Sequence, residues 1–186
     1  GLILLAEPIL MVLFMSGEFT SHAVIQSSHA LVAYVSGLIF FMMIKIMAPG
    51  FYSRQDTKTP VKFGIIAMVA NMAFNLILVF PLGYVGLALA TALSGALNAI
   101  LLTTALIRKK VFIVSPQTLW FIAKVVLASL LMSLVLSLQL PEFSEWLQME
   151  RATALFHMSK WIIIALVTFF SALFIMGARL KDIKDA

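Results

Sequence analysis

Long apolar segments constrain the fold of this chain more than any other feature of its sequence. Six of them alternate with short turns containing polar residues, proline or glycine, at residues of about 1–15, 24–48, 61–80, 84–107, 117–140 and 157–178. All but the first approach the roughly 20 residues with which a helix crosses a hydrocarbon core about 30 Å thick. A backbone in lipid must satisfy its own hydrogen bonds, and the strict alternation of barrel strands is missing, so we expect each segment to be a helix.

The composition indicates that lipid, and not water, is the solvent. Hydrophobic residues make up 62% and charged residues 11% of the chain, whereas soluble domains are about half apolar and a quarter charged. The absence of cysteine excludes disulfides and thiolate metal sites. The predicted fold is therefore all-α: a polytopic transmembrane helix bundle forming a single transmembrane domain over residues 1–186, with about five full helices and one truncated N-terminal helix.

The first apolar segment has no basic region before it and no small-residue cleavage site, so it is not typical of a signal peptide. The chain begins at Gly1, inside this apolar run. We interpret the segment as a helix that starts in mid-membrane, and we expect the chain to be a fragment of a longer protein.

The basic residues predict how the helices are oriented. Nine of the thirteen lie in the loop after the second segment, the loop after the fourth, or the C-terminal tail: Arg54, Lys58, Lys62, Arg108, Lys109, Lys110, Arg179, Lys181 and Lys184. The opposite connections carry mainly acidic residues, among them Glu18, Glu142, Glu145 and Glu150. By the positive-inside rule, the basic loops and the C-terminus face the cytoplasm. No basic stripe interleaves with aromatic residues, which argues against nucleic acid as a partner.

Aromatic residues are expected at the two membrane surfaces. Trp120 and Trp161 lie near the starts of predicted helices, where amphipathic rings anchor at headgroup level. The connection at residues 141–153 mixes apolar and acidic residues. It is either a short amphipathic helix on the outer membrane surface or an ordinary polar loop.

Polar side chains within the apolar segments are candidate functional residues, because they are costly in lipid. Asn71 and Asn75 lie one turn apart on one face of the third segment, and the next segment carries Thr91, Ser94 and Asn98. The tight turn between the two segments makes them antiparallel neighbours, so Asn71, Asn75 and Thr91 can meet at mid-depth. They either form interhelical hydrogen bonds or present oxygen atoms to a cation. A hard cation prefers a carboxylate among its ligands, and neither segment contains one.

Lys45 and Lys124 lie inside apolar segments, within about two turns of the predicted cytoplasmic edge. Long basic side chains so placed either extend to the interface or line a cavity that receives an anionic headgroup. The fifth segment carries Ser129, Ser133 and Ser137 on one narrow stripe, which predicts either a helix contact or the wall of a groove for a lipid tail. No metal-binding histidine motif, glycine-rich phosphate loop or nucleophilic triad is present, so we expect a transporter and not an enzyme.

The most specific motif runs from Ala48 to Pro60, with the sequence APGFYSRQDTKTP. It resembles the cytoplasmic loop of the MurJ (MviN) family, the lipid II flippases of bacterial peptidoglycan synthesis. Stretches in the same order along the chain are also similar to that family: LAEP from Leu5, GEFT from Gly17, NLIL from Asn75 and GYVGLA from Gly83. The resemblance implies fourteen transmembrane helices in two lobes, of which this chain would hold the end of the ninth and all of the tenth to fourteenth.

The resemblance also implies roles for particular residues. Asn71, Asn75 and Thr91 match positions that help to hold sodium in some members, and sodium is the only cofactor that the resemblance suggests. Arg54, Asp56 and Lys58 alternate in sign within this loop motif. They are expected either to form gating ion pairs with the other lobe or to set topology, with a helix cap near Thr59.

The expected function is movement of lipid II from the cytoplasmic to the periplasmic leaflet of the bacterial inner membrane, by alternating access. The expected partners are lipid II, membrane lipids and the missing N-terminal lobe of the same protein. The alternatives are an exporter of other lipid-linked oligosaccharides or of drugs from the same superfamily, and a non-transporting membrane scaffold or split-gene remnant.

Overall fold

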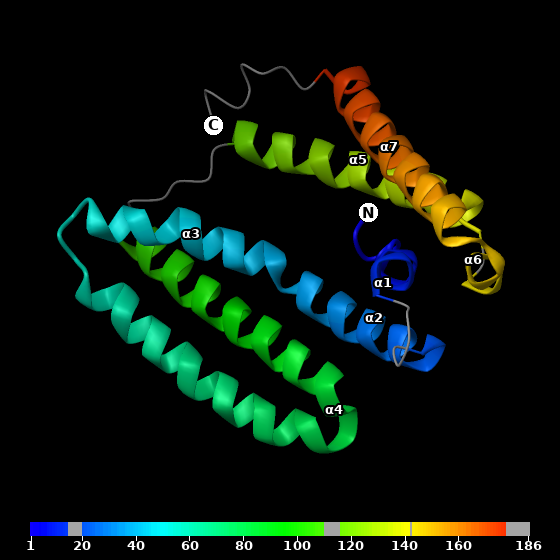
Figure 1. Ribbon diagram of the computed structural model, residues 1–186. Helices are drawn as coiled ribbons and strands as arrows, with labels where there is room; N and C mark the ends of the chain where they lie inside the picture. Colours follow the sequence, from blue (N-terminus) through cyan, green and yellow to red (C-terminus); the bar gives the residue numbers. More distant parts are fainter. Residues whose placement is uncertain (15–19, 110–115, 142, 178–186) are drawn as a thin grey trace. The chain divides into compact units, whose positions relative to one another are not determined.

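The computed structural model describes residues 1–14, 20–109, 116–141 and 143–177. These residues form seven helices and no strand, in agreement with the predicted all-α fold. The helices are α1 (Ala6–Phe14), α2 (Ser21–Ser36), α3 (Leu38–Tyr52), α4 (Lys58–Arg108), α5 (Pro116–Gln139), α6 (Phe143–Gln148) and α7 (Arg151–Ile175) (Figure 1). The chain divides into two compact units, unit 1 (Gly1–Val24 with Val114–Ala186) and unit 2 (Ile25–Ile113).

Unit 2 is built around the packing of α3 against α4. At 1.5 Å per residue, a straight helix of 51 residues would extend about 75 Å, far more than one membrane crossing needs. Instead α4 turns back at Gly83, where the backbone leaves the helical region with φ 54° and ψ −131°. The two halves of α4 therefore run antiparallel, as the hairpin in Figure 1 shows. The reversal falls at the turn that the sequence predicts between its third and fourth apolar segments.

Two glycines make this reversal possible. Gly83 adopts a positive φ that side chains with a Cβ rarely tolerate. At Gly86 a Cβ would lie 2.2 Å from the carbonyl oxygen of Leu78, so only glycine lets the halves approach so closely. Next to the turn, the hydroxyl of Tyr84 donates a hydrogen bond to Oε1 of Gln26 on α2, which fastens the turn within unit 2.

The second apolar segment differs from its prediction at both ends and in the middle. The helix starts at Ser21, is interrupted only at Gly37, and passes through Pro49 and Gly50 to end at Tyr52. At Gly37 the chain lies in close contact with the second half of α4, because a Cβ there would lie 2.6 Å from Cβ of Ala92.

The predicted stop at Pro49 was wrong, because α3 continues through it although proline lacks an N–H and its ring crowds the carbonyl one turn earlier. Burial of the next turn offsets that loss. Phe51 is 1% exposed and packs with Met47, Leu102 and Leu106.

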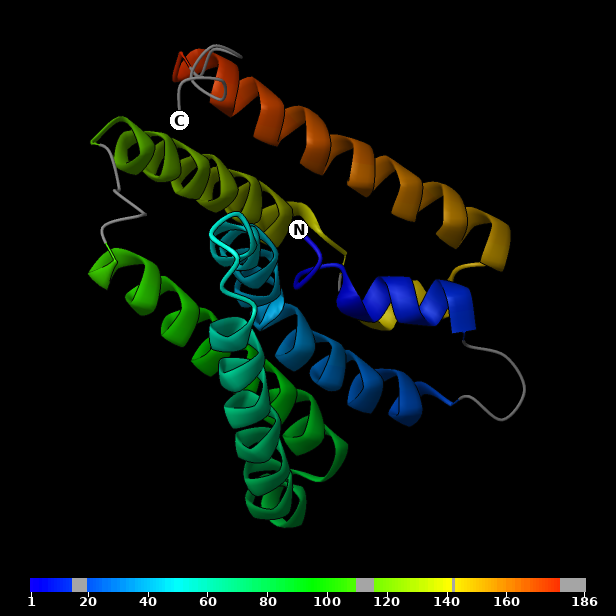
Figure 2. The same ribbon diagram turned by 90° about the vertical axis from the view of Figure 1, so that its left-hand side faces the viewer.

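In unit 1, α5 and α7 lie side by side, as Figures 1 and 2 both show, and α1 and α6 pack nearby. The core of this unit contains Trp146, Trp161 and Leu136. The connection predicted as either an amphipathic helix or a loop contains the short helix α6, with Trp146 turned inward and 1% exposed. Trp161 is also buried, because it packs in this core, and it lies well inside α7, which begins at Arg151, and not near the start of a helix as predicted.

Four helices in the described residues are long and apolar enough to cross a membrane: Ser21–Tyr52, Lys58–Arg108, Pro116–Gln139 and Arg151–Ile175. Because α4 folds back on itself, these four correspond to five crossings. Large apolar side chains are exposed along them, for example Phe80 at 88% and Phe174 at 83%. Such extensive apolar exposure is typical of a surface that faces lipid.

The reversal of α4 can be tested with a matched pair of glycines. Replacing Gly83 with alanine should destabilise the protein by about 1–3 kcal/mol, because the backbone there is strained for any residue with a Cβ. Replacing Gly64 should instead stabilise it by about 0.5–1 kcal/mol, because Gly64 lies inside a helix. A Cβ meets nothing within 4 Å at either position, so only backbone conformation separates them. Equal midpoints for both variants, measured by thermal unfolding in detergent, would contradict the turn.

Candidate functional site

A chain of hydrogen bonds links the two halves of α4 in the middle of its apolar length. The amide of Asn75 donates from Nδ2 to Oδ1 of Asn71 over 3.0 Å. Asn71 in turn donates from Nδ2 to Oγ of Ser94 over 3.1 Å. Ser94 then donates to the backbone carbonyl of Thr91 over 2.9 Å. We call these four residues the amide relay.

The amide relay matches the sequence prediction in part. Asn71 and Asn75 meet, as their spacing predicts, but the side chain that joins them from the other half of α4 is Ser94 and not Thr91. The hydroxyl of Thr91 donates to the carbonyl of Leu87, one turn earlier in its own helix. A cation at the predicted oxygen set would have to compete with the bond that Oδ1 of Asn71 already accepts.

A pocket of about 420 Å³ adjoins the relay within unit 2. Asn71, Thr91, Ser94 and Asn98 supply its polar side. The apolar side includes Phe41, whose ring lies so close to Gly95 that a Cβ there would be 2.4 Å from Cε1. Oδ1 of Asn98 is buried and finds no hydrogen-bond partner among the described residues. The small residues of α4 therefore serve close packing, while its amides and hydroxyls form one neutral polar face.

The loop motif between α3 and α4 is organised by Asp56. Its Oδ1 accepts a hydrogen bond from the backbone N–H of Thr59 over 3.1 Å, and its Oδ2 accepts one from Thr59 Oγ1 over 2.8 Å. This is the capping arrangement that satisfies an unpaired N–H in the first turn of a helix. Oδ2 also accepts from Nζ of Lys109 over 2.6 Å. The backbone N–H groups of Gln55 and Asp56 donate to the carbonyls of Tyr52 and Phe51, and Gln55 has a positive φ of 58°.

These contacts lower the pKa of the Asp56 carboxyl to about 2, chiefly through the hydrogen bond from Lys109 and then through those from Thr59. A carboxyl with a depressed pKa contributes stability above its ordinary pKa and loses it only as the pH falls through the lowered value. The Asp56 carboxyl is therefore ionised at neutral pH. Arg54 and Lys58, which the sequence groups with Asp56, are both exposed.

The two intramembrane lysines have different surroundings. Lys124 on α5 donates from Nζ to the carbonyl of Gly177 over 3.4 Å, just beyond the C-terminal end of α7. A cation at this end of a helix interacts favourably with the unpaired carbonyls and the helix dipole. Lys45 belongs to unit 2 and its side chain is exposed on α3. The structure thus gives Lys124 a helix-end contact, which the prediction of an interfacial or cavity-lining lysine did not specify.

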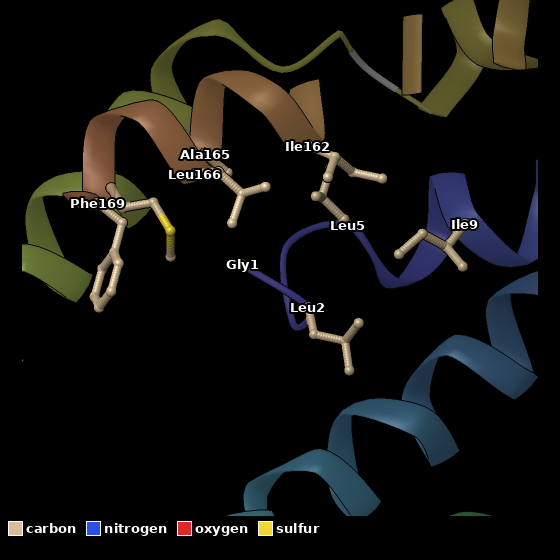
Figure 3. Close-up of a pocket in the computed structure, with 9 residues that line it drawn as sticks. Gly1, Leu2, Leu5, Ile9, Ile162, Ala165, Leu166 and Phe169 are labelled. Carbon is tan, nitrogen blue, oxygen red and sulfur yellow. The ribbon is translucent and has the colours of Figure 1, made fainter. Parts of the chain in front are cut away.

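Unit 1 contains an apolar pocket of about 410 Å³ (Figure 3). Its lining consists entirely of apolar residues: Gly1, Leu2, Leu5, Ile9, Met132, Ile162, Ala165, Leu166 and Phe169. The serine stripe on α5, predicted as a helix contact or groove wall, is absent from this lining, and Ser129 and Ser137 donate to carbonyls of their own helix. The α7 residues of this lining recur at intervals of three or four positions, which places them on one face of the helix. This spacing is the signal in the sequence that points to the pocket.

Comparison with known proteins decides the family. The family model described as "Lipid II flippase MurJ" matches residues 1–175.

The chain belongs to the MurJ lipid II flippase family.

Curated members of the MurJ family align along most of the chain. A protein of Vibrio cholerae named "Probable lipid II flippase MurJ" is 46% identical over 186 residues, which is 100% of this chain and 35% of that protein. A protein of the same name from Haemophilus influenzae is 43% identical over 179 residues, covering 96% of this chain and 35% of the relative. The chain thus spans about a third of the length of these relatives.

A solved MurJ structure has the same fold. "Lipid II flippase MurJ, inward closed conformation" superimposes with a TM-score of 0.76 at 26% sequence identity, covering 94% of this chain and 34% of that one. The expected membership of the MurJ family and the predicted helical membrane bundle are therefore both confirmed.

The amide relay of this MurJ-family chain predicts a measurable coupling. In a double-mutant cycle of Asn71→Ala and Ser94→Ala, the coupling free energy should be about 0.6–2 kcal/mol, the range of interhelical hydrogen bonds in membranes. The measurement is the free energy of unfolding in mixed micelles. The control cycle pairs Asn71→Ala with Thr104→Ala, whose hydroxyl bonds only to Ile100 of its own helix among the described contacts. Equal coupling in the two cycles would show that the relay does not join the halves of α4.

Proposed function

We propose that this chain is part of a lipid II flippase that moves the lipid-linked peptidoglycan precursor from the cytoplasmic to the periplasmic leaflet of the bacterial inner membrane. The observation that carries this proposal is the match of residues 1–175 to the MurJ family model. The TM-score of 0.76 with a MurJ structure adds that the helices have the arrangement of a known flippase. Because the chain covers only 35% of its relatives, transport is a property of a longer protein to which it contributes.

The distribution of charge supports an orientation with the basic loops and the C-terminus in the cytoplasm. In unit 2 the described basic side chains lie mostly in the loop before α4, in the first turns of α4 and at its C-terminal end, whereas the reversal at Gly83 carries no charge. The sequence after α7 is basic as well. Positive loops are retained on the cytoplasmic side of bacterial inner membranes.

Transport by alternating access needs groups that recognise a lipid with an anionic headgroup and an apolar tail. Exposed cations on unit 2, among them Lys45, Arg54 and Lys58, are of the sign that attracts the headgroup. The apolar pocket of unit 1 has the chemistry of a site for part of a lipid tail, because no polar side chain lines it. Lys124 is a weaker candidate for headgroup contact, since its Nζ already donates to the carbonyl of Gly177 after α7.

Depletion of the full-length protein carrying this chain tests the proposal. Bacteria that lose a lipid II flippase should lyse, with lipid II accumulating on the cytoplasmic side because its synthesis continues while its export stops. The measurement is the amount of lipid II in membranes and its accessibility to an external probe. A control depletion of an unrelated inner-membrane protein should leave both unchanged. Loss of a surface polysaccharide without lysis would favour export of another lipid-linked sugar and contradict the proposal.

A further inference from the structure

A single carboxylate at the basic end of unit 2 holds three helix ends. Asp56 caps the N-terminus of α4 through Thr59 and accepts a hydrogen bond from Lys109, which directly follows the C-terminus of α4. Asp56 and Lys109 are separated by 53 residues in sequence. The backbone N–H of Asp56 donates to the carbonyl of Phe51, in the last turn of α3, over 3.1 Å. Asp56 therefore contacts the end of α3 and both ends of α4.

Lys109 is fixed by a second contact. Its Nζ lies 5.4 Å from the centre of the Phe51 ring, within the range of a cation–π interaction. Phe51 itself is buried with Met47, Leu102 and Leu106, residues of α3 and of the second half of α4. The ion pair thus sits directly above the apolar contact that joins these two helices. Nζ of Lys109 therefore contacts both the carboxylate of Asp56 and the ring of Phe51.

The residues around Asp56 and Lys109 are basic, so removal of the Asp56 carboxylate would leave positive charges next to one another. Asp56 is the only aspartate or glutamate between residues 25 and 113. The same end of unit 2 carries exposed Arg54, Lys58, Lys62 and Arg108. Without the carboxylate, the three helix ends would present only like charges, which repel one another. The sequence offers no second acid in this unit to take its place.

We propose that Asp56 and Lys109 form a clasp that holds the basic ends of α3 and of both halves of α4 as one rigid body, and that Asp56 is thereby a positioning residue for transport. The part concerning transport rests on the proposed function. The clasp assigns Asp56 an internal partner, in contrast to a gating ion pair with another lobe. A lobe can rock as a rigid body only if its helix ends stay together. The clasp supplies this restraint at the basic end of unit 2.

The test measures the distance between helix ends in the full-length protein, purified and reconstituted. Spin labels are placed by Tyr52→Cys and Ile107→Cys, at exposed positions near the ends of α3 and α4, and this chain has no other cysteine. Asp56→Asn removes the charge but keeps a side chain that caps helices well. Lys109→Met removes the charge but keeps an apolar chain over Phe51. Arg108→Gln is the matched control, because Arg108 is exposed and adjacent in sequence to Lys109.

The expected result is a clearly broader distance distribution and a severalfold lower rate of lipid II flipping in Asp56→Asn and in Lys109→Met. The double variant should have no broader distances and no slower flipping than either single variant. Lys109→Arg keeps the positive charge and should leave the distances and the flipping rate as in the unsubstituted protein. Arg108→Gln should change neither.

Unchanged distances in both single variants, or additive effects in the double variant, would overturn the clasp. Broader distances with normal flipping would overturn the positioning role. If depletion of the protein leaves lipid II unaffected while the distances respond as expected, the proposed function fails and the clasp stands.

Discussion

The requirement that a backbone in hydrocarbon bond its own N–H and C=O groups determines most of this structure. It makes every long apolar segment a helix and leaves polar side chains as the means of joining helices inside the membrane. At the reversal of α4 only Gly83 leaves the helical conformation, so few backbone groups lose their helical partners within that turn.

Two kinds of polar contact follow from the same constraint, and depth separates them. The amide relay of Asn71, Asn75, Ser94 and Thr91 lies within the apolar length of α4 and is neutral. The charged contact between Asp56 and Lys109 lies outside the helices that span the membrane. This division reflects the high cost of placing an ion in lipid. Within unit 2, neutral hydrogen bonds therefore join helices at mid-length, and an ion pair joins them at one end.

The sequence predicted what depends on the solvent and on local backbone chemistry. Apolar length located the helices, and the Pro81–Gly83 turn located the hairpin, because glycine and proline act locally. It did not predict what depends on neighbours distant in sequence. The continuation of α3 past Pro49 needs the burial of Phe51, and the partner of Asp56 lies beyond the whole of α4. Ser94 was noted beside Thr91, but only the rotation of the two helical halves decides which hydroxyl meets Asn71.

The central claim is that lipid surrounds these helices and that α4 crosses it twice, with the basic loop before it in the cytoplasm. Single cysteines in place of Arg54 and Tyr84, both exposed, test this directly, and this chain contains no other cysteine. The measurement is their modification by a membrane-impermeant maleimide in intact and lysed spheroplasts. We expect the cysteine at position 84 to react in intact spheroplasts and that at position 54 only after lysis. Reaction of both from the same side would contradict the account.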